Sequence, residues 1–349
     1  MNEKFRNKND VVVIGTIEAT NFKYDPTWSS YDKSFTGAYV KDDYKKSYML
    51  RVLVEKKNEN GDVLSTAHVN VDFAFGVFAQ YKHNGEIKDN STFAELKKIA
   101  DSPNGGVGLP VRISGGNFVE NKYADQNFQL QRKGNKFEGR YISLSNVNLE
   151  DAKAEGYVTG IIESIRDDFK EGMPSGDKIV DFLTVKYTKD GVPVADKLTF
   201  VVPENLADDF ESLLREGDSA RLDVEMIDIK TEAKVEEHKA RGFGDRSAET
   251  TVSGTNRLQY RVFAGDIIEE GVEGYIDEEA FELIKHSYDV SCEALIQKKR
   301  EKENKNGGGS SAPISSRTVD SSASGFFETA EDPFAITDNI PAEDELPFA

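Results

Sequence analysis

The chain has 349 residues, of which 38% are hydrophobic and 31% charged, a balance that predicts globular domains together with a substantial unfolded part. No apolar stretch approaches the roughly 18 residues of a membrane helix, and the polar start lacks a secretory signal, so we expect a cytoplasmic protein without membrane contact. The formal net charge of −19 argues against phosphate contacts over the whole surface, and the single cysteine, Cys292, excludes an intramolecular disulfide.

The chain opens with a pattern of strands. The apolar run 11–18 suits a buried strand, and residues 48–54 form the next one. Asn60-Gly61 follows, a dipeptide that accepts positive φ at both positions of a tight hairpin turn. Residues 67–75 alternate between apolar and polar side chains, which predicts the returning strand.

A short helix is expected after these three strands. Ser91 is a suitable N-cap, and Phe93, Leu96 and Ile99 follow at helical spacing. Two more strands are predicted, at 109–113 and at about 137–147.

The same order recurs in the second part of the chain. Residues 158–164 mirror the first strand, and a strand over 179–187 reaches Asp190-Gly191, again a hairpin turn, before returning through 198–202. A helix over about 204–215 and strands at 220–229 and 258–267 complete the copy.

Strand, hairpin, strand, helix, strand, strand is the order of an OB-fold, a five-stranded Greek-key barrel. The sequence therefore predicts a mainly β protein with two OB-fold-like five-stranded barrels, a C-terminal helix and a disordered acidic tail. The expected organisation is a first module at 1–150, a second at 151–272, a helix at 273–304, a flexible linker at 305–330 and a partner-docking tail at 331–349.

The expected C-terminal helix has one apolar face, formed by Ile276, Phe281, Ile284, Tyr288, Leu295 and Ile296. We expect this face to pack on the second barrel. An oligomer contact is the alternative, so homo-oligomer formation stays open. The Gly- and Ser-rich composition of residues 306–325 is typical of a flexible linker.

Charge is distributed unevenly along the chain. Residues 1–150 carry a net charge of +2, whereas residues 151–304 carry −15 and residues 305–349 carry −6. Since contact with phosphates needs Lys and Arg, only the first module is electrostatically suited to nucleic acid.

The connection between the first two strands is rich in rings and cations. Eight aromatic residues lie between Asn21 and Arg51, in a stretch without strand or helix periodicity, which indicates a surface on which bases stack. The alternative is that many of these rings pack under a long loop. The candidate single-stranded-DNA contacts here are Phe22, Tyr24, Trp28, Tyr31, Lys33, Tyr39, Lys45, Lys46 and Arg51.

A second cluster is expected on the opposite wall of the same groove, where residues 132–135 (Arg-Lys-Gly-Asn) look like an exposed, positively charged turn. Ordinary solvated surface positions are the alternative for each cation. The candidate contacts are Tyr123, Phe128, Arg132, Lys133, Lys136, Arg140 and Tyr141. The corresponding loop of the second module, 235–254, is mixed in charge, so a supporting or protein-facing role is expected there.

The C-terminus carries a motif. Residues 331–335 read Glu-Asp-Pro-Phe-Ala, and the chain ends in Glu343, Asp344, Glu345, Leu346, Pro347, Phe348 and Ala349. Here the chain resembles bacterial single-stranded-DNA-binding proteins, especially those of Gram-positive bacteria, whose tails carry a similar Asp-Pro-Phe-Ala segment and finish with an acidic run before Leu-Pro-Phe or Ile-Pro-Phe. The match covers about nineteen residues.

The resemblance implies a docking peptide for replication, recombination and repair proteins. Phe348 would enter an apolar pocket on the partner, and Glu343, Asp344 and Glu345 would meet its basic rim. Two departures stand against the family pattern. Ala349 displaces the terminal carboxylate by one residue, and two barrels per chain replace the usual one. A phage- or plasmid-encoded version of the family would account for both.

Catalytic chemistry has no visible motif. The four histidines, His68, His83, His238 and His286, are scattered without metal-site spacing, and no phosphate-cradling loop is present. We therefore expect no catalytic residue, metal or cofactor, and a protein that coats single-stranded DNA and recruits partners. Two alternatives remain: an acidic decoy that occupies the partners of a host protein without coating DNA, and a nucleic-acid enzyme such as a nuclease subunit or an annealing factor.

Overall fold

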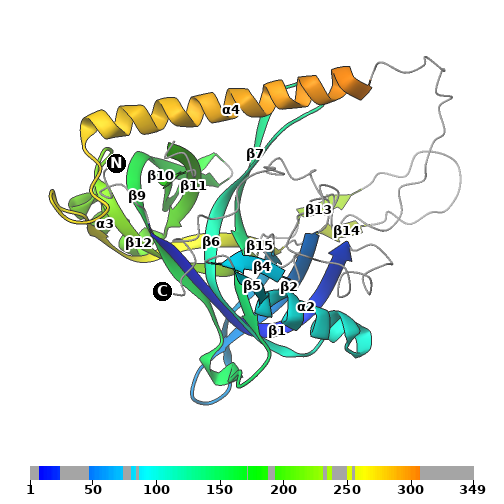
Figure 1. Cartoon of the computed structure of the whole chain (residues 1–349). Helices are drawn as coiled ribbons and strands as arrows, with labels where there is room; N and C mark the ends of the chain where they lie inside the picture. Colours follow the sequence, from blue (N-terminus) through cyan, green and yellow to red (C-terminus); the bar gives the residue numbers. More distant parts are fainter. Residues whose placement is uncertain are drawn as a thin grey trace, which may run out of the picture.

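The computed structural model describes residues 8–23, 47–73, 80–83, 86–170, 172–187, 193–230, 234–237, 250–253 and 256–306. In these residues strands predominate, and they build two closed barrels within one continuous sheet, with one long helix across the top in Figure 1. The mainly β, OB-fold-like prediction is confirmed.

The first barrel consists of β1 (Asn9–Lys23), β2 (Ser47–Lys57), β3 (Val63–Asp72), β6 (Pro110–Ala124) and β7 (Leu130–Glu138). Antiparallel pairs join β1 to β2, β2 to β3, β7 to β6 and β6 back to β1, and β3 pairs parallel with β7. Helix α2 (Ser91–Asp101) lies between β3 and β6 in the chain, which is the OB-fold order.

Smaller elements decorate this barrel. Strands β4 (Gln80–His83) and β5 (Glu86–Asp89) form a two-stranded sheet, and β8 (Tyr141–Ser143) pairs with β6. Short 3₁₀ turns lie at η5 (Pro103–Gly106) and η6 (Leu149–Asp151).

The second barrel repeats the topology. Its strands are β9 (Lys153–Lys170), β10 (Met173–Tyr187), β11 (Pro193–Val202), β12 (Ser219–Lys230) and β15 (Asn256–Ile267). Again the third and fifth strands, β11 and β15, pair in parallel, and the fourth, β12, closes onto β9. Helix α3 (Glu204–Leu213) precedes β12, and the strands β13 (Lys234–Glu237) and β14 (Thr250–Ser253) pair within the β12–β15 connection.

Two glycines, Gly15 and Gly160, occupy equivalent positions in the first strands of the two barrels. A Cβ on Gly15 would lie 2.3 Å from the carbonyl oxygen of Leu53, and a Cβ on Gly160 would lie 2.2 Å from that of Leu183. In both barrels the first strand therefore passes so close to the second that no side chain fits. Glycine is needed at this point because its backbone can approach another strand directly.

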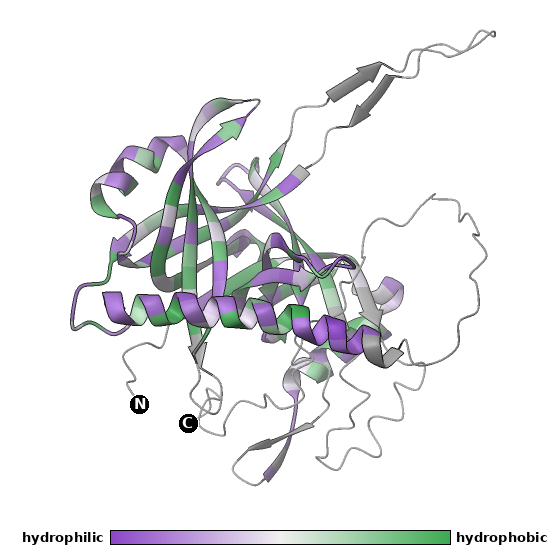
Figure 2. Ribbon diagram, turned by 90° about the horizontal axis from the view of Figure 1, so that it is seen from above, coloured by the Kyte–Doolittle hydropathy of each residue, from purple (hydrophilic) through white to green (hydrophobic). Residues whose placement is uncertain are grey.

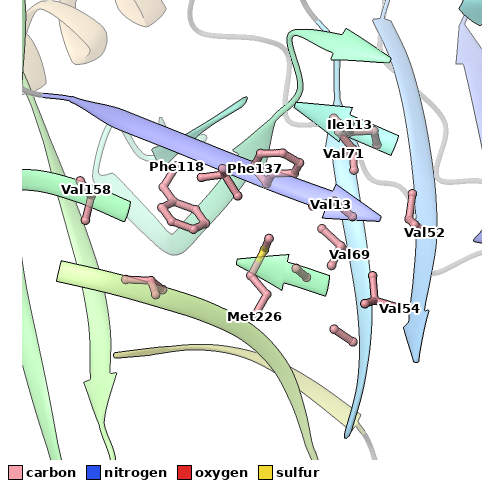
Figure 3. Packing of buried hydrophobic residues seen from close by; sticks show 14 of the residues in the cluster. Val13, Val52, Val54, Val69, Val71, Ile113, Phe118, Phe137, Val158 and Met226 are labelled. Carbon is pink, nitrogen blue, oxygen red and sulfur yellow. The ribbon is translucent and has the colours of Figure 1, made fainter. Parts of the chain in front are cut away.

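The two barrels share one core. Residues Asn9–Ile14 of β1 pair with Lys153–Val158 of β9, so the sheet runs from one barrel into the other. Phe118 of the first barrel packs edge-on against Phe200 and Tyr260 of the second, at ring separations of 6.0 and 5.5 Å. Figure 3 shows the continuation of this packing, with Met226 of the second barrel beside valines of the first.

Helix α4 (Glu278–Asn306) lies along the second barrel, as the apolar spacing predicts. Its buried residues Ala280, Ile284, Tyr288 and Cys292 recur every fourth position and contact a patch on β9, β10 and β11. That patch consists of Ile161, Leu183, Val185 and Ala195.

Local chemistry differs from the sequence expectation at three points. The N-cap of α2 is Asn90, whose side chain accepts a hydrogen bond from the Thr92 amide, so Ser91 is the wrong cap. The β2–β3 turn is not a tight two-residue turn: Asn58 closes a longer loop by accepting from the amides of Asn60 and Asp62, and of the dipeptide only Gly61 has positive φ.

The last strand of the first barrel begins earlier than expected, at Leu130 rather than near Phe137, and continues from a hairpin with β6. Residues 132–135 therefore lie within β7 and do not form the predicted turn, although residues 132–134 are exposed as expected. A glycine with φ of +82°, Gly134, kinks the strand there, and the apparent turn signal is this kink. The Asp190-Gly191 turn lies outside the described residues.

Candidate nucleic-acid interface

Strands β6 and β7 project from the first barrel as a two-stranded ribbon that reaches α4 (Figure 1). We name this ribbon, residues 119–136, the arm. It is the connection between the fourth and fifth strands, which in OB-folds forms one wall of the ligand groove. Asp125 closes its turn by accepting from the amides of Asn127 and Gln129, each at 2.8 Å. These bonds, that from Gln129 foremost, lower the pKa of the Asp125 carboxyl.

The inner face of the arm holds a buried carboxylate, Glu120. Its Oε1 accepts from the hydroxyl of Tyr288 on α4, at 2.7 Å, and from the guanidinium of Arg132. Its Oε2 forms an ion pair with the ammonium of Lys122 and accepts from the Lys197 amide, each at 3.1 Å. A buried charge is tolerated only when it is paired and hydrogen-bonded, and here three hydrogen bonds and the ion pair with Lys122 satisfy both oxygens.

The environment of Tyr288 is unusual. Burial, and then the hydrogen bond to Glu120, raise the pKa of its phenol well above the usual range. Two ammonium groups face its ring, that of Lys122 at 4.2 Å and that of Lys197 at 5.2 Å from the centroid. The phenol therefore stays protonated and donates, and the barrels, the arm and α4 meet at this one residue.

Further bonds attach the arm to β11. The Asn135 amide group donates to the Thr199 carbonyl and accepts from the Thr199 amide, at 2.8 and 2.9 Å. The guanidinium of Arg132 donates to the Lys197 carbonyl at 3.2 Å. These contacts place the arm over β11, the third strand of the second barrel.

The second barrel consequently has little open groove. In OB-folds the face of strands two and three binds the ligand. Here the equivalent strands, β10 and β11, contact α4 through Leu183, Val185 and Ala195, and the arm contacts β11 further along, at Lys197 and Thr199. Arg166 of β9 and Asp181 of β10 form an ion pair on the same barrel. The pKa of Asp181 is lowered, because the bonds from Arg166 and Thr199 outweigh the opposing effect of burial.

The tip and outer face of the arm carry rings beside cations. The Lys133 ammonium lies 5.0 Å from the centroid of the Tyr123 ring, and the Arg300 guanidinium of α4 lies 5.3 Å from that of Phe128. Phe128 adopts a left-handed φ of +58°, which side chains other than glycine rarely do. We name this set, Tyr123, Phe128, Lys133 and Arg300, the ring cluster.

The other described candidate residues, near the base of the arm, do not belong to the ring cluster and make contacts of their own. The guanidinium of Arg140 lies 5.6 Å from the ring of the neighbouring Tyr141. Lys136 pairs with Glu138 at 2.9 Å, and Arg51 pairs with Glu18 at 2.8 Å. Arg51 on β2 and Lys136 on β7 are therefore already paired with carboxylates.

The structure brings together only part of the predicted site. On the arm, Lys133 faces the ring of Tyr123, and Phe128 faces Arg300 of α4, whereas Arg132 points to Glu120. Phe22 belongs to β1, but its side chain is outside the description. The remaining candidates lie outside the described residues: Tyr24, Trp28, Tyr31, Lys33, Tyr39, Lys45, Lys46, Glu343, Asp344, Glu345, Leu346, Pro347 and Phe348.

Sequence reasoning missed Arg300, Glu120 and the junction role of Tyr288. Arg300 stands in a solvated charged run, and nothing local in the sequence places it against Phe128. Glu120 did carry a signal, an acidic residue inside an otherwise apolar strand pattern beside Lys122. In the described residues no group of His, Cys, Asp and Glu side chains could hold a metal ion, and none of the described helices is long and apolar enough to cross a membrane.

The sequence and the structure were compared with known proteins. Among solved structures the chain is similar to the wild-type single-stranded DNA binding protein from Thermus aquaticus, with a TM-score of 0.42 and 12% identity over 76% of this chain and 95% of that one. A deletion mutant of the same protein gives a TM-score of 0.38 and 10% identity, over 76% and 96%. At this similarity the likeness adds no argument to the topology above.

No curated protein matches the sequence. The family model described as YorF matches residues 9–306, which span both barrels, the arm and α4. The match covers most of the chain, and the chain therefore belongs to the YorF family.

Proposed function

We propose that this protein binds single-stranded DNA without sequence preference, coats it during replication, recombination or repair, and recruits other proteins through its acidic C-terminus. In this proposal it is a binding protein and not an enzyme. The first barrel with its arm supplies the DNA contacts, and the second barrel holds the arm in position.

The ring cluster carries the proposal. Bases stack on aromatic rings while Lys and Arg contact phosphates, and each stacked base contributes about 1–3 kcal/mol whatever its identity. On the arm, Tyr123 and Phe128 lie beside Lys133 and Arg300, on the connection that forms a groove wall in OB-folds. The sequence identifies the segment 24–46, which lies outside the described residues, as rich in rings and lysines, and the proposal assigns the opposite wall of the groove to it.

Fluorescence anisotropy with labelled oligo-dT, single-stranded DNA of mixed sequence and the matched duplex tests the proposal. We expect similar affinity for the two single strands, weaker binding to the duplex, and affinity that falls as salt rises, because phosphate contacts release counterions. Absence of binding to either single strand at low salt contradicts the proposal. Recovery of shortened oligonucleotide after incubation with magnesium supports the enzyme alternative instead.

A double variant locates the site. Tyr123→Ala with Phe128→Ala removes both stacking rings and should weaken binding to oligo-dT by at least tenfold, since about 1–3 kcal/mol is lost per ring. Phe169→Ala is the matched control, because Phe169 is an exposed ring on the β9–β10 hairpin of the second barrel. Equal affinities for the double variant and the control place the DNA elsewhere. Replacing Trp28 and Tyr31 tests the opposite wall in the same assay.

Recruitment by the tail has its own test. Deletion of residues 331–349 should leave oligo-dT binding intact or tighter, while a pull-down of replication and repair proteins by the full chain is lost. Phe348→Ala should reproduce that loss, since an aromatic anchor dominates such peptide contacts. Partner binding by a chain that ignores oligo-dT favours the decoy alternative.

A further inference from the structure

Helix α4 has a second apolar stripe, which we name the outer stripe: Leu283, Ser287, Val290 and Ala294. Leu283 and Val290 are 61% and 50% exposed, and the other two residues are small. At about 100° per residue the four positions fall within an arc of about 60°, so they form one line along the helix. Their spacing of four, three and four residues is the pattern by which two helices pack together.

The outer stripe is separate from the side chains that hold α4 on the second barrel. Those buried side chains run from Ala280 to Cys292, and their mean direction lies about 110° around the helix from the outer stripe. In Figures 1 and 2, α4 lies on the outside of the molecule, and no described element lies across its outer side. The helix also continues to Asn306, beyond its last buried contact. Core packing therefore explains neither the outer stripe nor the final turns.

The charge of α4 reverses along its length. Residues 278–296 contain five acidic and one basic side chain, whereas residues 297–306 contain five basic and two acidic ones. Two copies of this helix side by side in antiparallel orientation place the acidic part of each beside the basic end of the other. A parallel pair places like charges together, which is unfavourable. The charge pattern therefore selects a second copy of the same chain, in antiparallel orientation, as the partner of the outer stripe.

We propose that two copies of this protein associate through the outer stripe, with their α4 helices antiparallel and related by a twofold axis between residues 288 and 289. In this register Leu283 of one copy lies opposite Ala294 of the other, and Ser287 lies opposite Val290, so that each large side chain faces a small one. Such a contact is self-complementary, as a twofold interface must be. The inference goes beyond the proposed function and does not depend on DNA.

The register also gives a place to the charged residues beside the outer stripe. At a rise of about 1.5 Å per residue, His286 of one copy and Glu293 of the other lie about 3 Å apart along the axis, on the same flank of the contact. The basic end of each helix begins at the height of Glu278 and Glu279 of the other copy. Opposite charges therefore meet at both ends of the pair.

Sedimentation velocity without DNA, over about 1–100 μM protein, tests the interface. A contact along one helix is at the small end of protein interfaces, so we expect a reversible monomer–dimer equilibrium. Leu283→Gln with Val290→Gln should weaken dimer formation at least about tenfold, because the apolar area that the contact buries is lost. The control is Phe169→Gln with Met173→Gln, an equally exposed apolar pair on the β9–β10 hairpin, which should dimerise like the wild type. A monomeric wild type, or equal losses in the two variants, overturns the proposal.

Cysteine crosslinking tests the orientation. In the proposed register the two copies of residue 290 lie about 4.5 Å apart along the axis, and the two copies of residue 301 lie about 38 Å apart. Val290→Cys should therefore form a disulfide-linked dimer under mild oxidation, and Glu301→Cys should not. The wild-type chain, whose Cys292 is buried, is the control and should stay unlinked. Linking at 301 overturns the antiparallel register, and linking at neither position overturns the interface.

Salt gives a further readout. Dimer formation should weaken as salt rises, because the opposite charges of the two helices are screened, and a dimer that strengthens with salt contradicts the charge argument. Unchanged circular dichroism and thermal unfolding of each variant, expected for exposed positions, exclude loss of the helix as the cause. Wild-type protein that binds oligo-dT as a monomer throughout the concentration range overturns the interface while the proposed function stands. A dimer that ignores oligo-dT has the opposite meaning.

Discussion

Glu120 and Tyr288 show how single residues organise this protein. The two are 168 positions apart in sequence and meet at 2.7 Å, where the arm, α4 and the second barrel converge. Because Glu120 is buried, each of its donors matters: removing one partner leaves charge or polarity without compensation. The junction therefore gives a definite orientation to the arm that carries the ring cluster.

Removal of the central carboxylate should be costly. Glu120→Ala leaves Lys122 and Arg132 without their buried partner, and we expect unfolding free energy to fall by about 3–5 kcal/mol. Glu155→Ala is the matched control, since Glu155 pairs with Lys153 at 3.4 Å near the surface, and such pairs contribute about 0–1 kcal/mol. Urea unfolding measures both. Equal losses would contradict the structural role of Glu120.

Tyr288 also predicts a dependence on pH. An unfolded tyrosine ionises near pH 10, whereas burial and the bond to Glu120 hold the folded phenol protonated at higher pH. Its contribution to stability is thus complete below pH 10 and is lost as pH rises above that value. Tyr288→Phe should lower the free energy of unfolding by about 1.5–3 kcal/mol at pH 7. Above pH 10, the stability of this variant should fall less steeply with pH than that of the wild-type protein. A Tyr157→Phe control with the same alkaline profile as Tyr288→Phe would refute this assignment.

At the level of elements, the first strand of each barrel is constrained by its partner. Gly15 and Gly160 occupy equivalent positions, and in both the missing side chain would clash with a backbone carbonyl of the second strand. The same local solution appears twice because the same barrel closure is built twice. The arm, by contrast, differs between the two barrels. In the first barrel the fourth and fifth strands, β6 and β7, extend to contact β11 of the second barrel.

Alanine at these glycines tests the barrel closure. Gly15→Ala and Gly160→Ala each force two backbones apart, and overpacking of this kind costs about 1–3 kcal/mol or more. We expect both variants to lower the thermal midpoint by comparable amounts. A variant with wild-type stability would show that the first two strands are further apart in that barrel.

At the level of the whole molecule, the barrels are not independent units. They share the β1–β9 pairing and an aromatic core that joins Phe118 to Phe200 and Tyr260, and His68 of β3 contacts Asp228 of β12. Separation of the barrels would expose this core to water, which the hydrophobic effect opposes. The shared pairing and packing therefore fix the orientation of each barrel relative to the other.

This continuity predicts cooperative unfolding. Scanning calorimetry on the full chain should show one transition, because neither barrel keeps a closed surface when the other unfolds. Oligo-dT in excess should raise the midpoint of that single transition, since a ligand of the native state stabilises the whole cooperative unit. Two resolved transitions, with only the first shifted by DNA, would contradict the shared core.

Much of the architecture followed from sequence alone. Alternation, turn residues and two short amphipathic helices predicted both barrels, since these patterns report which side of each element is buried. The spacing also predicted Ile284 and Tyr288 of the buried stripe on α4, but Ala280 and Cys292 complete that stripe, and the predicted Leu295 and Ile296 are only half-buried. The sequence also identified the arm as rich in rings and cations; Lys133 faces Tyr123 there, whereas Phe128 faces Arg300 of α4.

The tertiary structure alone decided the rest. No local pattern states that residues 132–135 continue a strand, that Arg132 turns inward to Glu120, or that Arg300 reaches Phe128. Those contacts join segments far apart in sequence, and their energies arise from burial and pairing that exist only after the barrels have packed. Periodicity describes one element at a time, whereas the site is assembled from the arm, α4 and the surface beneath them.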